Sequence, residues 1–299
     1  MGDFIHRYRA ILQMLAGAFM ISFSAIFVKL ADVAPTCSAF YRVFFGFFFL
    51  FAMAVLKKDL AKPPPAQLLL LAFCGLAFAL DLFFWHESII YIGPGLATLL
   101  GNFQVFLLAA IAIFFFGERA RFRFLLSLPI AIFGLFLIVG LDWQRLSSDY
   151  KTGIYLGLLT AVCYTVYLLG LKKAQADGSR SPVFSLLLVC FSCALFLGLQ
   201  MAHHGDSFSI PNLKTLFALI GLGLFSQTVG WMLIAGALPK IQTSLAGLIL
   251  LLQPSLSFLW DVLFFSRPTS LLNWVGVVLA LAAIYMGLTS KTQRNSSSP

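Results

Sequence analysis

Long apolar runs dominate this chain of 299 residues. Ten of them are long enough to cross the roughly 30 Å hydrocarbon core of a bilayer as helices of about 20 residues. They fall at residues 11–31, 36–56, 67–90, 94–116, 123–141, 152–170, 183–202, 213–236, 241–264 and 270–289. Backbone groups in lipid must be hydrogen-bonded internally, and the alternating pattern of a transmembrane barrel is absent. We therefore expect an all-α integral membrane protein with ten transmembrane helices.

Composition and charge distribution support a membrane protein and exclude an ordinary soluble domain. Hydrophobic residues make up 61% of the chain and charged residues 10%. The net charge of +9 is spread unevenly. With a cytoplasmic N-terminus, 14 Lys and Arg residues fall on the cytoplasmic side and 5 on the other, with Arg42 inside the membrane. This positive-inside bias predicts cytoplasmic N- and C-termini. Because it accounts for the excess of basic residues, we expect no nucleic-acid partner.

The second half of the chain repeats the first. A shift of 149 residues aligns residues 92–116 with 241–265, giving eight identities in which Gln104 matches Gln253. Internal repeats are typical of secondary transporters, whose substrate sites lie near the bilayer midplane at the repeat interface. Five helices per half is an odd number, so the repeats must insert with opposite orientations. We expect a first repeat at residues 1–146, a second at 147–290 and a disordered cytoplasmic tail at 291–299.

The two matched glutamines are predicted to lie at similar depths. Residues 93–95 are expected to open the fourth helix, and residues 242–244 the ninth, the latter through side-chain capping. Each glutamine follows about ten residues later, which is roughly 15 Å along a helix and about half the hydrocarbon core. Pro254 should loosen the ninth helix and free a carbonyl near its centre.

Several short motifs carry a family resemblance. They are Trp85–Ser88, Tyr91–Ala97 and Phe115–Arg119 in the third and fourth helices, Phe23–Arg42 with its Tyr41–Arg42 pair, and Leu251–Pro254 in the ninth. Together they resemble EamA-type proteins of the drug/metabolite transporter superfamily, over essentially the whole chain.

The resemblance implies ten helices with cytoplasmic termini, a central cavity between the repeats, and export of small metabolites such as amino acids, purines or toxic amphiphiles. A bacterial inner (plasma) membrane is the expected location. The family often has a second Glu after the ninth helix to match the one after the fourth. Here Glu118 has Arg267 as its counterpart, so a symmetric carboxylate pair is missing.

Two charged residues inside predicted helices require partners or a cavity, because they are costly in a membrane. Asp81 is the deepest carboxylate and is expected to share a helix face with Phe78 and Trp85. It is a candidate for the coupling-proton site, or for an internal ion pair with Arg42. Arg42 is in turn a candidate for binding a substrate carboxylate or phosphate, or for a structural pair with Asp81 or Glu87.

Buried amide and aromatic side chains supply further candidates for a substrate site. Gln104 and Gln253 must bond either to a ligand or across helices, and the latter is common for buried glutamines in membranes. Weaker candidates for the same cavity wall are Trp85, Asn102, Tyr164, Gln227 and Trp231.

We predict a secondary transporter, monomeric or homodimeric, that exports small metabolites such as amino acids or related amphiphiles by alternating access around a midplane site. No Walker motif is present, and no cofactor or metal is expected. The alternatives are a passive channel, a non-transporting scaffold, or an intramembrane enzyme using Asp81, His86 and Glu87. Against the enzyme, helical geometry places His86 about 140° and Glu87 about 120° from Asp81, on different sides.

Overall fold

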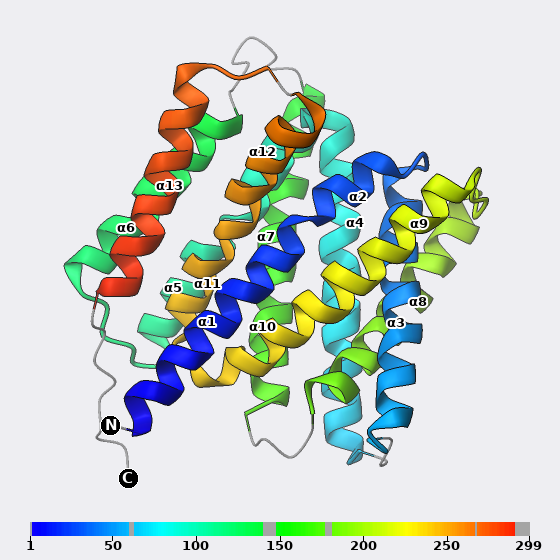
Figure 1. The fold of residues 1–299 in the computed structure, drawn as a ribbon, viewed down its shortest axis with the longest axis horizontal. Coiled ribbons are helices and arrows are strands. Elements are labelled where there is room, and N and C mark those ends of the chain that lie inside the picture. The colour runs from blue at the N-terminus through cyan, green and yellow to red at the C-terminus, as the bar shows by residue number, and fades with distance from the viewer. Residues whose placement is uncertain (1, 60–62, 140–147, 177–180, 267, 291–299) are drawn as a thin grey trace.

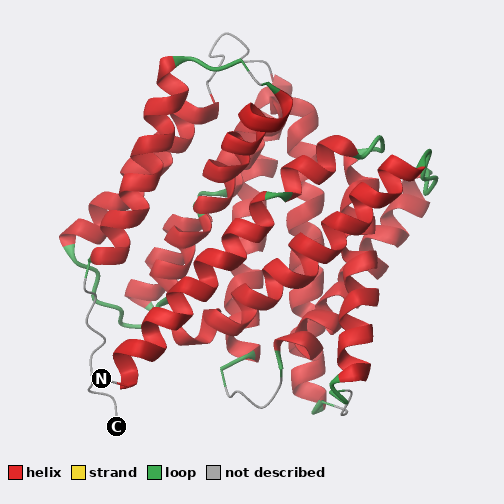
Figure 2. Ribbon diagram, in the orientation of Figure 1, coloured by secondary structure: helices red, strands yellow, loops and turns green. Residues whose placement is uncertain are grey.

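A computed structural model describes residues 2–59, 63–139, 148–176, 181–266 and 268–290 of the chain. Over these residues it consists of helices joined by short connections, without strands (Figure 2). Ten helical stretches in this part of the chain are long and apolar enough to span a membrane, from Tyr8–Leu30 to Leu271–Thr289. The predicted fold class is therefore confirmed. The predicted boundary between residues 146 and 147 and the predicted tail lie outside the described residues.

The first half of the chain contains the first five spans. Its helices are α1 (Gly2–Ser22), α2 (Ser24–Leu30), α3 (Pro35–Leu56), α4 (Pro65–Gly101), α5 (Gln104–Phe114) and α6 (Phe122–Val139). Prolines begin α3 and α4, where a missing N–H leaves no hydrogen bond unmade. The first span is interrupted at Phe23, between α1 and α2.

Helix α4 contains the third span and the start of the fourth. We expected the fourth helix to open at residues 93–95, but the backbone stays helical through them. The chain nevertheless reverses direction here, as shown by a hydrogen bond that the indole Nε1 of Trp85 donates to Thr98 Oγ1 at 3.1 Å. In a straight helix, thirteen residues would separate these groups by about 20 Å. The predicted change of direction is present, made by a tight helical turn.

The second half contains the remaining five spans. Its helices are α7 (Ser148–Ala174), α8 (Pro182–His204), α9 (Leu213–Gly221), the π-helix η1 (Leu222–Gly230), α10 (Trp231–Ala237), the 3-10 turn η2 (Leu238–Lys240), α11 (Thr243–Leu250), α12 (Leu252–Phe265) and α13 (Leu271–Thr289). Helix η1 lies in the middle of the eighth span, and π-helical segments of this kind occur frequently at functional sites.

The fourth and ninth spans are interrupted at equivalent positions. The fourth breaks at residues 102–103, between α4 and α5, and the ninth breaks at Leu251, between α11 and α12. The shift of 149 residues that aligns the repeats places Asn102 on Leu251. The break that we predicted from Pro254 is therefore confirmed, and the first repeat makes the same break without a proline.

The bundle is assembled from helix pairs that join the two halves of the chain. Helix α4 packs along α7, α6 along α13, and α3 along α8. In Figure 1, α6 and α13 lie together on one side, while α3, α8 and α9 lie on the other. Helix α1 begins and α13 ends toward the same end of the bundle, which we call the terminal end (Figure 1).

Helices α6 and α13 cross at two glycines, Gly134 and Gly276. A Cβ added to Gly276 would lie 2.5 Å from the carbonyl oxygen of Gly134 and 2.8 Å from the backbone nitrogen of Ile138. Because these are backbone atoms, a side chain here would push the helices apart. We expect Gly276→Ala to destabilise the protein by about 1–3 kcal/mol, which is typical of overpacking, and to lower the unfolding temperature in detergent.

A matched control is Gly198→Ala, whose added Cβ would meet the ring of Phe40 at 3.1 Å. A ring can move where a backbone cannot, so this variant should lose less stability. Equal unfolding temperatures for the two variants would contradict the proposed helix contact.

Candidate functional site

A cavity of about 650 Å³ lies between the two halves of the chain. Its size is within the range of small-molecule sites in proteins. Seven of the nine residues predicted for a substrate or coupling site line it: Arg42, Asp81, Trp85, Asn102, Tyr164, Trp231 and Gln253. The other two, Gln104 and Gln227, are fully buried outside its lining. Most of the residues that we predicted from the sequence therefore line the same cavity.

The cavity lies away from the terminal end of the bundle. Its lining includes several residues between Ile21 and Lys29 at the end of the first span. It also includes Ser38, Ala39 and Arg42 at the start of the second, and Asp261 near the end of the ninth. Lys29 Nζ contacts Asp261 Oδ1 at 2.7 Å, and half of the Lys29 side chain is exposed. This pair connects α2 to α12 and marks the mouth of the cavity.

Arg42 and Asp81 face the same cavity without pairing with each other. In the described part of the chain, the ion pair between Lys29 and Asp261 is the one formed, and neither Arg42 nor Asp81 takes part in it. The Nε of Arg42 donates instead to Gln227 Oε1 at 2.9 Å, and its guanidinium lies 5.9 Å from the centre of the Phe78 ring. The cavity therefore presents one cationic and one acidic side chain.

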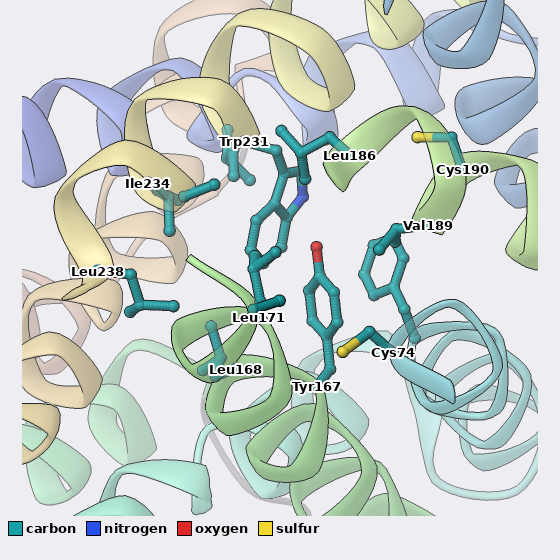
Figure 3. Packing of buried hydrophobic residues seen from close by; sticks show 14 of the residues in the cluster. Cys74, Tyr167, Leu168, Leu171, Leu186, Val189, Cys190, Trp231, Ile234 and Leu238 are labelled. Carbon is teal, nitrogen blue, oxygen red and sulfur yellow. The ribbon is translucent and has the colours of Figure 1, made fainter. Parts of the chain in front are cut away.

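Aromatic rings form another part of the cavity wall that contains Arg42 and Asp81. Phe78, Tyr164 and Trp231 line the cavity, and Tyr167 lies behind them, stacked on Phe78 at 4.6 Å between ring centres. Trp231 and Tyr167 meet edge to face at 4.9 Å (Figure 3). This layer continues into an apolar core of buried side chains, which includes residues at the terminal end such as Ala10 and Met14.

Free cysteines belong to this packing. Cys190 and Cys193 are both buried and free, and they pack in the apolar core as small hydrophobic residues. Figure 3 shows Cys74 and Cys190 at the edge of the same cluster.

The matched glutamines have different surroundings in spite of their equivalent positions. Gln253 lines the cavity together with Tyr164, and its Nε2 has no hydrogen-bond partner among the described residues. Gln104 is buried and its Nε2 reaches the carbonyl oxygen of Gly247 at 3.5 Å. Gln104 thus joins α5 to α11 across the repeats, whereas Gln253 is available to a ligand.

From the helical angles, we expected His86 to lie on a different side of the helix from Asp81. It is buried, lines the cavity together with Asp81, and contacts Trp85 edge to face. The lining residues of the third span, from Phe78 to His86, occupy a sector of about 140° around α4, with Asp81 and His86 at its two edges. Glu87 is not part of the lining, so the three residues considered for an enzyme do not share one site.

The terminal end of the bundle is held closed by polar contacts. The Glu118 carboxylate accepts hydrogen bonds from Thr243 N at 2.8 Å, Ser244 N at 3.4 Å and Ser244 Oγ at 2.6 Å. Lys172 Nζ donates to Ile241 O at 2.6 Å and Thr243 Oγ1 at 2.8 Å. We expected the start of the ninth helix to be capped by its own side chains; a distant carboxylate caps it instead.

These features define an integral membrane protein whose described residues form ten membrane-spanning stretches around a cavity of small-molecule size. The sequence model of the EamA-like transporter family matches residues 8–140 and 151–289, once in each half. The chain belongs to this family, and the family resemblance seen in the sequence is confirmed.

Two of the curated relatives are similar over about nine tenths of their length. Protein PagO of Salmonella typhimurium is 24% identical over 91% of this chain and 92% of its own. A "probable amino-acid metabolite efflux pump" of Escherichia coli is 24% identical over 90% of both chains. A solved crystal structure of a protein 17% identical to this one covers 94% of the chain with a TM-score of 0.80, which supports the fold.

Proposed function

We propose that this transporter exports zwitterionic metabolites of the amino-acid class by alternating access around the central cavity. The observation that carries the proposal is that Arg42 and Asp81 line one cavity without forming an ion pair with each other within the described chain. Two opposite charges kept apart in a membrane-embedded site match a ligand that has both charges. The name of the Escherichia coli relative points to the same substrate class.

In the proposed binding mode, the substrate carboxylate lies against the guanidinium of Arg42. The planar fork of Arg suits a carboxylate through two parallel hydrogen bonds. The substrate ammonium group lies against Asp81, and an apolar or aromatic substrate side chain packs on Phe78 and Trp231. Gln253 and Asn102 supply neutral hydrogen-bonding groups to the same space.

Coupling to a proton follows from the chemistry of Asp81. A carboxylate can hold a proton or a substrate ammonium group, but both compete for the same oxygens. Binding of one therefore displaces the other, and alternating access makes this competition an antiport of substrate and proton. Such a mechanism needs one carboxylate, in agreement with the absence of a symmetric partner for Glu118. The proton gradient across the membrane then supplies the energy for export of the substrate.

The proposed orientation follows the distribution of basic residues. Cytoplasmic termini in a bacterial inner membrane place the mouth at Lys29 and Asp261 on the outer side. The arrangement then corresponds to the state that releases exported substrate, with Glu118 and Lys172 closing the cytoplasmic side. Rocking of the repeats would open that side for loading.

Counterflow in proteoliposomes tests this function. Vesicles preloaded with L-phenylalanine are expected to accumulate labelled L-phenylalanine transiently, whereas nucleobases and sugar phosphates should give no exchange. Saturation and trans-stimulation would separate a carrier from a channel. Counterflow of a nucleobase or sugar phosphate without that of any amino acid would overturn the proposed substrate class.

The unequal positions of the two glutamines lead to a prediction within the same assay. We expect Gln253→Ala to raise the KM for the amino acid by about tenfold, since a hydrogen bond to a charged group contributes about 1.5 kcal/mol. Gln104→Ala should leave KM nearly unchanged and lower thermal stability, because its side chain contacts Gly247 rather than the cavity. Equal increases in KM would indicate that the site is symmetric after all.

A further inference from the structure

Gln227 contacts Arg42, the one Lys or Arg among the described residues that lines the cavity away from its mouth. It lies in the π-helical segment η1 of the eighth span and is fully buried. Its Oε1 accepts from Arg42 Nε at 2.9 Å, and its Nε2 donates to Cys190 Sγ at 3.3 Å. Both ends of the amide are therefore engaged, and the orientation of the side chain is fixed.

The backbone geometry brings Gln227 against the helix that bears Arg42. A Cβ added to Gly46, one turn after Arg42 on α3, would lie 2.5 Å from Gln227 Cγ. The glycine thus allows the glutamine to pack directly on the α3 backbone. The π-helical segment sets where Gln227 emerges from the eighth span, since a π-helix advances side chains differently from an α-helix.

The choice of an amide as the partner has an electrostatic consequence. Arginines inside membranes are ordinarily paired with carboxylates, which orient the guanidinium and also cancel its charge. An amide oxygen orients the guanidinium through Nε but carries no charge. The two terminal nitrogens of Arg42, which form the fork that matches a carboxylate, make no hydrogen bond within the described chain.

We propose that Gln227 is a positioning residue that sets substrate selectivity by fixing Arg42 while adding no negative charge beside its guanidinium. A ligand must then contribute an anionic group to the cavity, so amines that lack a carboxylate are rejected although Asp81 could hold their ammonium group. This inference rests on the proposed function and specifies which half of the zwitterion is obligatory.

The test is Gln227→Glu, which has nearly the same size and shape and places a carboxylate beside Arg42. The probes are L-phenylalanine and 2-phenylethylamine, which differ by the carboxylate. The wild-type protein should exchange the amino acid with at least tenfold greater kcat/KM than the amine. In Gln227→Glu this preference should reverse, mainly through a higher KM for phenylalanine and a lower KM for the amine.

Gln227→Met is the matched control, since it keeps the volume and removes the hydrogen bonds without adding charge. It should weaken phenylalanine exchange without creating amine exchange. Thermal unfolding in detergent verifies that both variants fold. If the wild-type protein exchanges phenylalanine and Gln227→Glu keeps the same preference, the inference fails while the proposed function stands. If the wild-type protein exchanges no amino acid, the proposed function itself fails.

Discussion

Asp81→Asn is expected to abolish proton-driven transport. Exchange of substrate for substrate across the membrane should be retained at saturating substrate concentration. Asparagine has nearly the same shape as aspartate but cannot take up and release a proton. With one proton per substrate, an imposed difference of one pH unit supports an accumulation ratio of about tenfold, because it is worth 1.36 kcal/mol. The variant should reach a ratio of about one. Its KM for L-phenylalanine should also increase, because the ammonium group loses its counter-charge.

The measurement compares labelled phenylalanine in proteoliposomes with and without a pH difference across the membrane. Asp261→Asn serves as the control. This carboxylate also lines the cavity but lies at the mouth, paired with the partly exposed Lys29. Exposed pairs typically contribute 0–1 kcal/mol, so the control should keep its response to pH. If Asp81→Asn retained both the rate and the pH dependence of the wild type, Asp81 would have no coupling role.

The sequence predicted the spans well because their signal is local. The observed third and tenth spans, Pro65–Ile92 and Leu271–Thr289, differ from the expected 67–90 and 270–289 by at most two residues at either end. Length and apolar composition determine whether a segment can cross a bilayer, and neither depends on the neighbouring helices.

The rotation of each helix about its axis was the part that the sequence could not provide. Gln104 and Gln253 lie at equivalent positions, directly after the breaks in the fourth and ninth spans. Which of them faces the cavity depends on how α5 and α12 pack against other helices. The cost of leaving a glutamine unbonded in the membrane could be met by a ligand or by Gly247, and only the packing decides.

Long-range contacts account for the remaining differences. His86 reaches the cavity because the other helices leave a sector of about 140° of α4 facing it, wide enough to include both Asp81 and His86. Glu118 caps a helix 125 residues later in the chain. A cap supplied from another part of the fold leaves no local sequence signal, although Glu118 belongs to a motif that had already indicated the family.

Glu118→Ala is expected to shift the protein toward the state open at the terminal end. The carboxylate accepts three hydrogen bonds from the first turn of α11, and these contacts must break before that end can open. Hydrogen bonds to charged groups contribute about 1.5–3 kcal/mol each. A net loss of one or two kcal/mol from the closed state would change the ratio of the two states by roughly 5–30-fold.

Reciprocal cysteine labelling measures this shift. With the native cysteines replaced, Ala246→Cys reports on the terminal end, where Ala246 is buried in the core, and Ser24→Cys reports on the cavity wall. Glu118→Ala should increase labelling at position 246 and decrease it at position 24. An increase at both positions would indicate general loosening and contradict a latch. Loss of transport without either change would place the role of Glu118 in folding. Reciprocal changes, by contrast, require one equilibrium linking the two ends of the cavity, which is the property that distinguishes a carrier from a pore.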